Sequence, residues 1–186
     1  MEKKFILTDK FVINSFGIKL FQIKCTKSFK YAQKGDFGGY VEKEGNLDQE
    51  NDAWVFGNAR VFGNARVSSN ARVSGDAWVF GNARVSGNAR VSGDAWVSGN
   101  AWVSGDADIE NDNEHCGFDG FGSCNRHTHA YMTKEKKVEI ICGCFRGSIE
   151  EFEKKVEETH SGTVYEKQYK SIINVIKIKF GLTDFT

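Results

Sequence analysis

The sequence contains no proline, no long apolar stretch and no excess of charge of either sign. Because a membrane-spanning helix needs about 20 consecutive apolar residues, we expect none in this chain. The N-terminal segment MEKKFILTDKF has an apolar run too short for a secretion signal. The formal net charge is 0, and no part of the chain has the strong basic excess of proteins that hold nucleic-acid phosphates. We therefore expect neither a membrane nor a nucleic acid as partner.

Cysteine is scarce and odd in number, with five residues. Together with the missing secretion signal, this favours a reducing cytoplasm over an oxidising compartment. Histidine is scarcer still, with four residues, and none lies between Met1 and Glu114. The first part of the chain therefore lacks the side chain that most often serves as a general base.

What the chain does contain falls into three zones. Residues 1–46 carry nine Lys and five acids, and their strand-like runs and Gly-rich turn predict a cap of strands. Residues 47–112 carry five Arg and nine acids in a six-residue repeat. Residues 113–186 are balanced, with eleven basic and eleven acidic residues. We interpret these zones as an N-terminal cap, a repeat domain and a C-terminal module.

The repeat unit consists of Ala, a variable residue, Val, a second variable residue, Gly, and Asn or Asp. Ala and Val are two residues apart, so they share one face of a strand, and the residue between them points the other way. Gly followed by Asn or Asp then turns the chain, because these residues tolerate conformations that others resist. A short strand and a corner every six residues predict a coil that buries Ala and Val and stacks each turn on the last.

This pattern resembles the hexapeptide-repeat family, which folds as a left-handed parallel β-helix. The aliphatic position is filled from Val55 to Ile109 in steps of six, and the small position from Ala53 to Ala107. In that family three hexads make one triangular coil, so the eleven hexads of residues 47–112 imply nearly four coils. The expected fold is therefore mainly β, with a short left-handed β-helix.

Beyond Asn113 the six-residue period is lost. The segments HAYMT and KVEIICGCF predict a β-hairpin around KEKK. SIEEFEKKVEETHSG predicts a helix that begins with a capping box of Ser148 and Glu151 and ends before Gly162. YEKQYKSIINVIKIKFG predicts a second helix that ends at Gly181. The third zone is therefore expected to be a small α+β module with two helices.

The segments that flank the hexads carry a second resemblance. KGDFGGYVEKEGNLDQENDAWV on one side, and FGSCNRHTHAYM with CGCFRGSIEEFEKKVEETH on the other, resemble proteins common in bacteriophages and prophages. Those proteins join a hexapeptide β-helix to a small α+β tail and carry loose labels such as polymer-forming or transferase-like. The resemblance implies a phage-encoded protein in the cytoplasm of an infected or lysogenic bacterium, and almost nothing about activity.

The variable residues of the hexads form ladders, since residues 18 apart stack on successive coils about 4.8 Å apart. The three faces of the coil are therefore unequal. The second face should carry Phe62, Trp78, Phe80 and Trp96, with Arg60 at one end. The first and third faces should present Trp54, Arg72 and Arg90, and Arg66, Arg84 and Trp102, respectively.

The aromatic second face is the expected contact surface. A soluble monomer rarely leaves so much contiguous apolar surface exposed, and Trp and Arg are enriched at interface hot spots. We expect this face to bind a partner, first of all another copy of the chain, so that the protein is a homo-oligomer. Two alternatives stay open: the C-terminal helices cover the face, or ring stacking and cation–π contacts simply stabilise the ladder.

The sequence contains few of the residues that catalysis or metal binding would need. Many hexapeptide β-helix proteins are acyltransferases that need a general base, usually His, but all four His lie outside the repeats. We therefore expect no catalytic residue and no cofactor. The C-terminal zone holds zinc-capable side chains, but no CxxC pair, and buried Cys is commonly inert, so we expect no bound metal. The candidates are Cys116, Cys124, His127, His129, Cys142 and Cys144, in which each pair two residues apart would share a strand face.

The sequence thus predicts a non-catalytic, phage-encoded binding or scaffold protein that recognises a macromolecular partner. In a phage setting the expected partner is a host protein, such as a defence factor. One alternative is a sponge for a nucleotide signal, in which Arg binds phosphate and Trp stacks on the base. Another is an acyltransferase-like enzyme of the hexapeptide-repeat type.

Overall fold

The computed structural model describes residues 2–182. The chain forms two compact units, residues 1–112 and residues 113–186. The first unit contains the repeats and the second contains both α-helices. A mainly β fold with a β-solenoid and two C-terminal helices, as the sequence predicts, is confirmed.

The hexads form a parallel β-solenoid of about four turns. Each hexad from residue 53 on contributes one two-residue strand. Strands 18 residues apart pair in parallel, as Arg66 does with Arg84. The strands are β4 Trp54–Val55, β5 Arg60–Val61, β6 Arg66–Val67, β7 Arg72–Val73, β8 Trp78–Val79, β9 Arg84–Val85, β10 Arg90–Val91, β11 Trp96–Val97, β12 Trp102–Val103 and β13 Asp108–Ile109. They form three faces: β4, β7, β10 and β13 on the first, β5, β8 and β11 on the second, and β6, β9 and β12 on the third.

The inner positions and the corners of the coil explain why Ala, Val and Gly recur at fixed places in each hexad. The repeated Ala and Val side chains are at most 4% exposed, so they fill the core of the solenoid. Most corner glycines adopt positive φ, for example Gly75 at 67°. A Cβ atom on Gly75 would lie 2.8 Å from the carbonyl oxygen of Gly93 on the next coil. Gly at this position therefore serves both the turn and the close stacking of coils.

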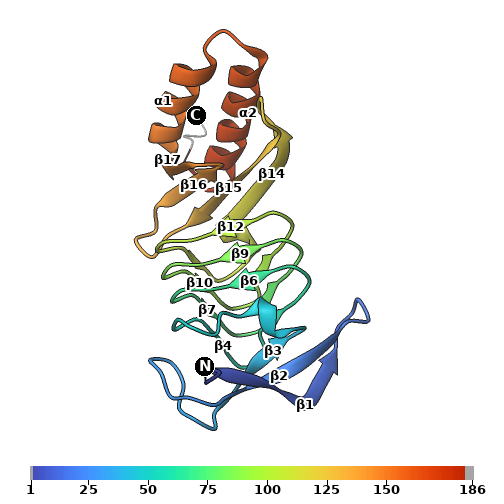
Figure 1. The fold of residues 1–186 in the computed structure, drawn as a ribbon. Helices are drawn as coiled ribbons and strands as arrows, with labels where there is room; N and C mark the ends of the chain where they lie inside the picture. The colour runs from blue at the N-terminus through green and yellow to red at the C-terminus, as the bar shows by residue number, and fades with distance from the viewer. Residues whose placement is uncertain (1, 183–186) are drawn as a thin grey trace. The chain divides into compact units, whose positions relative to one another are not determined.

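The N-terminal zone continues the sheet of the second face. The zone contains strands β1 Phe5–Ile13, β2 Lys19–Cys25 and β3 Phe37–Val41, and β2 pairs antiparallel with both of its neighbours. β3 then pairs in parallel with β5, so the sheet runs in the order β1-β2-β3-β5-β8-β11. A 3-10 helix, η1 Glu44–Asn46, leads into the repeats. In Figure 1 the β1–β2 hairpin reaches out beyond the edge of the stacked coils.

The second unit is a four-stranded antiparallel sheet with two helices. Its strands are β14 His115–Phe121, β15 Arg126–Met132, β16 Val138–Cys142 and β17 Phe145–Ser148, in that order across the sheet, after a 3-10 helix η2 Asp112–Glu114. The predicted hairpin around KEKK corresponds to β15 and β16, but it is half of the sheet, since β14 and β17 extend it on either side. The sequence pattern missed these two because β14 contains two glycines and β17 has four residues.

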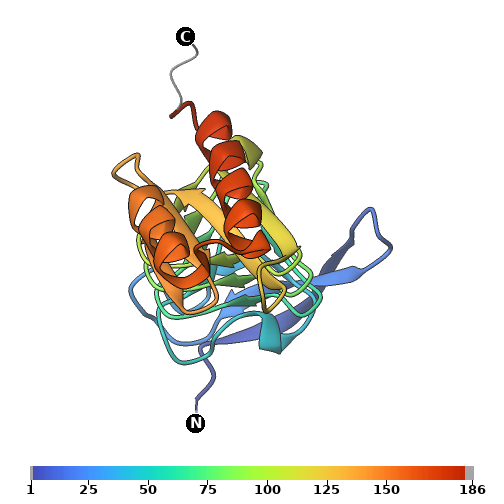
Figure 2. The same cartoon turned by 90° about the horizontal axis from the view of Figure 1, so that it is seen from above.

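Both predicted helices are present, as α1 Ile149–His160 and α2 Val164–Lys179, and lie side by side in Figure 2. The capping box of Ser148 and Glu151 is formed as predicted. The apolar faces of the helices, with Phe152 and Ile173 among them, pack in one core with Ala130 and Ile140 of the sheet. Among residues 2–182 no helix is long and apolar enough to cross a membrane.

Candidate functional site

The second face of the solenoid is largely covered by the chain itself. The ring of Phe16, in the β1–β2 turn, lies 6.0–6.1 Å from the rings of Phe62, Trp78 and Phe80. Leu20 of β2 joins the same cluster, and Phe62 and Trp78 are only 3% and 9% exposed. Phe62 and Trp78, which the sequence placed in the contact surface, are therefore covered within the chain. A hairpin far from them in the sequence packs over them.

The C-terminal helices were the alternative cover that the sequence left open. The apolar side chains of those helices pack within the second unit, and the cover of the second face comes from the N-terminal strands. The stacking contacts of the ladder are present. Trp78 and Trp96 are stacked with ring centroids 4.9 Å apart, and the guanidinium of Arg60 lies 4.8 Å from the Trp78 ring centroid. Trp96, at the end of the ladder, stays 42% exposed.

The first face is covered as well. Trp54 is buried against the rings of Phe5 and Phe29. The guanidinium of Arg72 lies over the Tyr31 ring, with 5.1 Å between them. Further along the face, Arg90 forms an ion pair with Asp108 at 3.6 Å. Trp54 and Arg72 therefore hold the N-terminal segment against the solenoid, and Arg90 links two adjacent coils.

The third face is the open one. Its three ladder residues, Arg66, Arg84 and Trp102, are all exposed, and they stack in register on adjacent strands. We call this surface the arginine face. It consists of Arg66, Arg84 and Trp102, the serines Ser68 and Ser86 on one side, and the asparagines Asn64, Asn82 and Asn100 on the other.

Two grooves run along the arginine face, one on each side of the Arg66, Arg84 and Trp102 row. The first has a volume of about 660 Å³ and is bordered by the serines and by segment 44–49. The second has a volume of about 400 Å³ and is bordered by the asparagines. The two guanidinium groups and the indole therefore form a ridge that is accessible from both sides.

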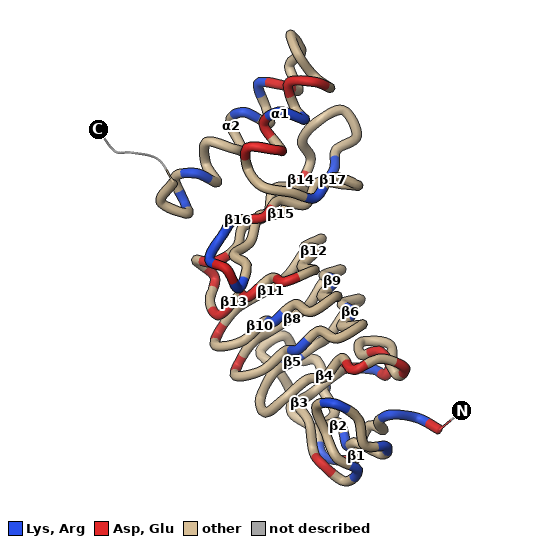
Figure 3. The backbone as a smooth tube through the Cα atoms, turned by 90° about the vertical axis from the view of Figure 1, so that its left-hand side faces the viewer, with Lys and Arg blue, Asp and Glu red and all other residues tan. Residues whose placement is uncertain are grey.

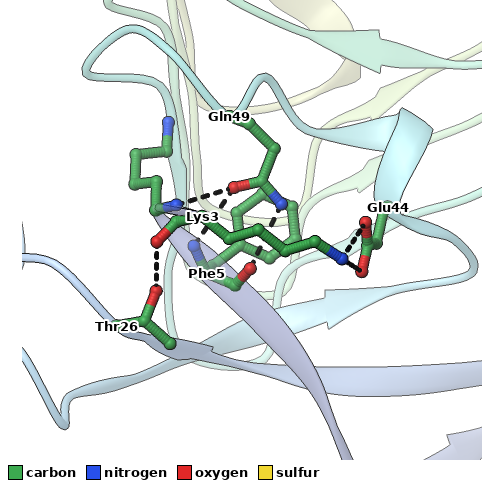
Figure 4. A network of polar contacts seen from close by, with 6 residues as sticks. Lys3, Phe5, Thr26, Glu44 and Gln49 are labelled. Atoms are coloured by element: carbon green, nitrogen blue, oxygen red, sulfur yellow. Dashed lines mark hydrogen bonds and ion pairs between the residues drawn. The ribbon is translucent and has the colours of Figure 1, made fainter. Parts of the chain in front are cut away.

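The charges of this ridge are not neutralised within the described part of the chain. Neither Arg66 nor Arg84 forms an ion pair with any of residues 2–182. The acids that border the first groove already have partners. Glu44 accepts hydrogen bonds from the Lys3 ammonium, at 2.7 and 2.9 Å, as Figure 4 shows. Asp48 accepts from the Asn51 side chain and from the backbone N–H of Glu50.

Acidic residues of the coils gather on another edge of the solenoid. Asp76 and Asp94 lie at the corner between the first and second faces, the one corner that does not border the arginine face. Figure 3 shows acidic residues along one edge of the stacked coils. The corners that do border the arginine face carry Asn64, Asn82, Asn100, Asn70 and Asn88, together with the two acids Asp52 and Asp106. The charged side chains of the arginine face itself are therefore Arg66 and Arg84, with Glu44 and Asp48 across the first groove.

The zinc-capable side chains of the second unit are split between different places. Cys116 and Cys142 lie on the helix side of the sheet, where burial raises the pKa of the Cys116 thiol to about 11. The Nδ1–H of His127 donates to the Asp119 carboxylate at 2.9 Å, and the His127 ring lies beside that of His129. Within residues 2–182 no three His, Cys, Asp or Glu side chains form a group that could hold a metal ion.

One of the predicted pairs does not share a strand face. β16 ends at Cys142, which pairs with Phe145 across a tight turn at Gly143. Cys142 is therefore buried, whereas Cys144 lies in the turn and is exposed. Cys124 is also exposed, in the turn between β14 and β15. The pattern of alternate residues failed here because the strand is shorter than the apolar run that predicted it.

Comparison with known proteins supports the fold alone. Residues 53–69, 71–87, 77–93 and 83–99 match the family model described as YdcK β-solenoid repeat. No curated protein matches the chain. The repeat match and the stacked parallel coils agree with each other, and the chain is accordingly a β-helix repeat protein.

Proposed function

We propose that the protein is a non-catalytic binding module that recognises a macromolecular partner through its arginine face. The observation that carries this proposal is the row of Arg66, Arg84 and Trp102, exposed in register between two open grooves. Trp and Arg are the residue types most enriched at interface hot spots. On the other two faces, Trp54, Arg72 and Trp78 instead contact aromatic residues of the N-terminal segment.

The shape of the site favours a macromolecule over a small ligand. Small-molecule sites are usually enclosed clefts that bury most of their ligand, whereas the arginine face is a ridge with grooves on either side. It also contains no histidine, since all four lie in the second unit. Acyl transfer on the solenoid would therefore lack the usual general base. In the phage setting implied by the sequence, the partner that we propose is a protein of the bacterial host.

The proposal is tested by site-specific photo-crosslinking. A benzophenone amino acid replaces Ser86, which borders the first groove, and, as a matched control, Ser92, the equivalent residue after β10 on the first face. Both serines are partly buried. We expect one protein to be crosslinked from position 86 and not from position 92 when the chain is produced in bacterial cells.

Binding is then reconstituted from the two purified proteins. The expected result is a saturable complex of fixed stoichiometry that weakens about tenfold or more in an Arg66→Ala/Arg84→Ala variant, as is typical of hot-spot residues. A Lys10→Ala/Lys34→Ala variant removes the same charge from exposed N-terminal positions and should bind like the parent. Equal loss in both variants, or equal crosslinking from both positions, would reject the arginine face as the recognition surface.

A further inference from the structure

We propose that the arginine face binds an acidic, carboxylate-rich segment of a partner protein. This inference rests on the proposed function and specifies the chemistry of the partner. It starts from Arg66 and Arg84, which are paired residues of adjacent parallel strands. Their backbones are therefore about 4.8 Å apart. Two guanidinium groups this close repel each other, and an anion that bridges them relieves the repulsion.

The surroundings of the two arginines are rich in hydrogen-bond donors. On one side, the Asn64 amide donates to Asn82 and the Asn82 amide donates to Asn100, each at 3.2 Å. The side-chain oxygens of Asn82 and Asn100 are thereby occupied as acceptors within the ladder. On the other side, Ser68 and Ser86 supply hydroxyl groups. Carboxylate oxygens are acceptors only, so they match a surface of this kind, and Arg binds them in bidentate geometry.

The acids near the grooves do not fill this role. Glu44 is held by Lys3 (Figure 4), and Asp48 is held by Asn51 and a backbone N–H. Asp76 and Asp94 lie at the corner remote from the face, where Asp76 accepts from Asn58. The two carboxylates that line the first groove are therefore engaged elsewhere, which leaves Arg66 and Arg84 open to carboxylates of another molecule.

The overall charge distinguishes a protein segment from a nucleic acid. Residues 47–112 carry five Arg and nine acids, a formal charge of −4. A nucleic acid presents a dense row of phosphates and is normally held by a basic excess, which the repeats do not have. An acidic segment needs only a few carboxylates opposite the ridge, and the indole of Trp102 offers an apolar contact beside them. The arginine face therefore fits a protein segment better.

The inference is tested with the full chain and a fluorescein-labelled decaglutamate peptide, whose binding is followed by fluorescence anisotropy. We expect saturable binding that weakens about fivefold or more between 50 and 200 mM salt, because salt screens exposed charge pairs. Arg66→Ala/Arg84→Ala should weaken binding at least tenfold. Arg66→Lys/Arg84→Lys keeps the charge but loses the bidentate geometry. Its affinity for the peptide should therefore lie between those of the parent and the double-alanine variant. Lys10→Ala/Lys34→Ala should bind like the parent.

A competition experiment shows whether the arginine face prefers carboxylate or phosphate groups. Unlabelled decaglutamate should displace the probe, and adenosine monophosphate or inorganic tripolyphosphate at the same charge concentration should not. If only the phosphates compete, or if the Lys10/Lys34 variant loses as much affinity as the Arg66/Arg84 variant, the inference is overturned. If the crosslinked partner still requires Arg66 and Arg84 but binds independently of salt and of decaglutamate, the inference fails while the proposed function stands.

Discussion

At the scale of single residues, position 69 shows how far the repeat constrains the backbone. Every hexad from Gly57 to Gly105 has glycine at this corner position except the one that contains Ser69. Ser69 nevertheless adopts φ of 60°, close to the values of the corner glycines. A residue with a Cβ atom is strained in this conformation by about 1–2 kcal/mol. The solenoid geometry therefore overrides the preference of the residue.

Replacing Ser69 by glycine should stabilise the protein. The substitution relieves backbone strain in the folded state, but glycine also has more conformational freedom in the unfolded chain, which offsets part of the gain. The expected net increase in the free energy of unfolding is about 0.5–1 kcal/mol. The measurement is denaturant unfolding at constant pH. Ser68→Gly is the matched control, because Ser68 does not have positive φ, and it should lower the stability slightly. A loss of stability in Ser69→Gly would contradict the strain argument.

Lys4 gives the chain a pH dependence. Its ammonium is buried and donates to the backbone oxygens of Asn51 and Ala53, and burial lowers its pKa from 10.5 to about 8. At a pH between these two pKa values, Lys4 is protonated to a greater extent in the unfolded state than in the folded state. Stability contributed by Lys4 therefore rises with pH from about 8 to about 10.5, and the cost of burying the charge is present in full below pH 8.

The test compares the parent with Lys4→Met across pH 7–10.5. The free energy of unfolding of the parent should increase relative to that of the variant by up to about 1.4 kcal/mol per pH unit within this window. The variant removes this titrating group and leaves the others in place. A difference between the two proteins that stays constant from pH 8 to pH 10 would show that the Lys4 pKa is not lowered.

At the scale of elements, the β1–β2 hairpin covers the aromatic second face of the solenoid. Its turn residue Phe16 lies against three aromatic rings of the second face. Trp78 is therefore a core residue, although its place in the repeat is the same as that of the exposed Trp96. The two tryptophans make a matched pair for testing this cover.

Trp78→Ala should cost about 3 kcal/mol or more, the usual effect of truncating a buried aromatic side chain. Trp96→Ala should cost much less, because Trp96 is 42% exposed and loses mainly one stacking contact of about 1 kcal/mol. Thermal unfolding of both variants gives the comparison. Equal melting temperatures for the two would indicate that the hairpin does not cover the second face in solution.

At the scale of the whole molecule, self-association through the second face stays a prediction. What remains exposed there is a rim made of Phe16, Trp96 and part of Phe80. Burying this rim against a second copy would displace water from three aromatic rings. We expect a homo-oligomer by light scattering and a lower mass for Trp96→Arg, which places a charge at the rim. A monomeric parent protein would exclude this contact, and the arginine face would not be affected by that result.

The sequence by itself was sufficient for the solenoid. The inward Ala and Val positions, the corner glycines and the 18-residue stacking follow from a repeat in which every local contact lies within one coil or between neighbours. The helices of the second unit were equally readable, since the Ser148 capping box and the apolar spacing of α2 are local signals. The ladders of Arg and Trp, and hence the residues of the arginine face, could also be read from the period.

Only the tertiary structure decided which of these ladders is a surface. The cover of Trp78 by Phe16 joins residues 62 positions apart in the chain, and no local pattern encodes that contact. For the same reason the sequence favoured the aromatic second face, where Phe62 and Trp78 are buried, over the third face, where Arg66 and Arg84 are exposed. Periodicity determines which side chains point outward, but exposure depends on what the rest of the chain packs against them.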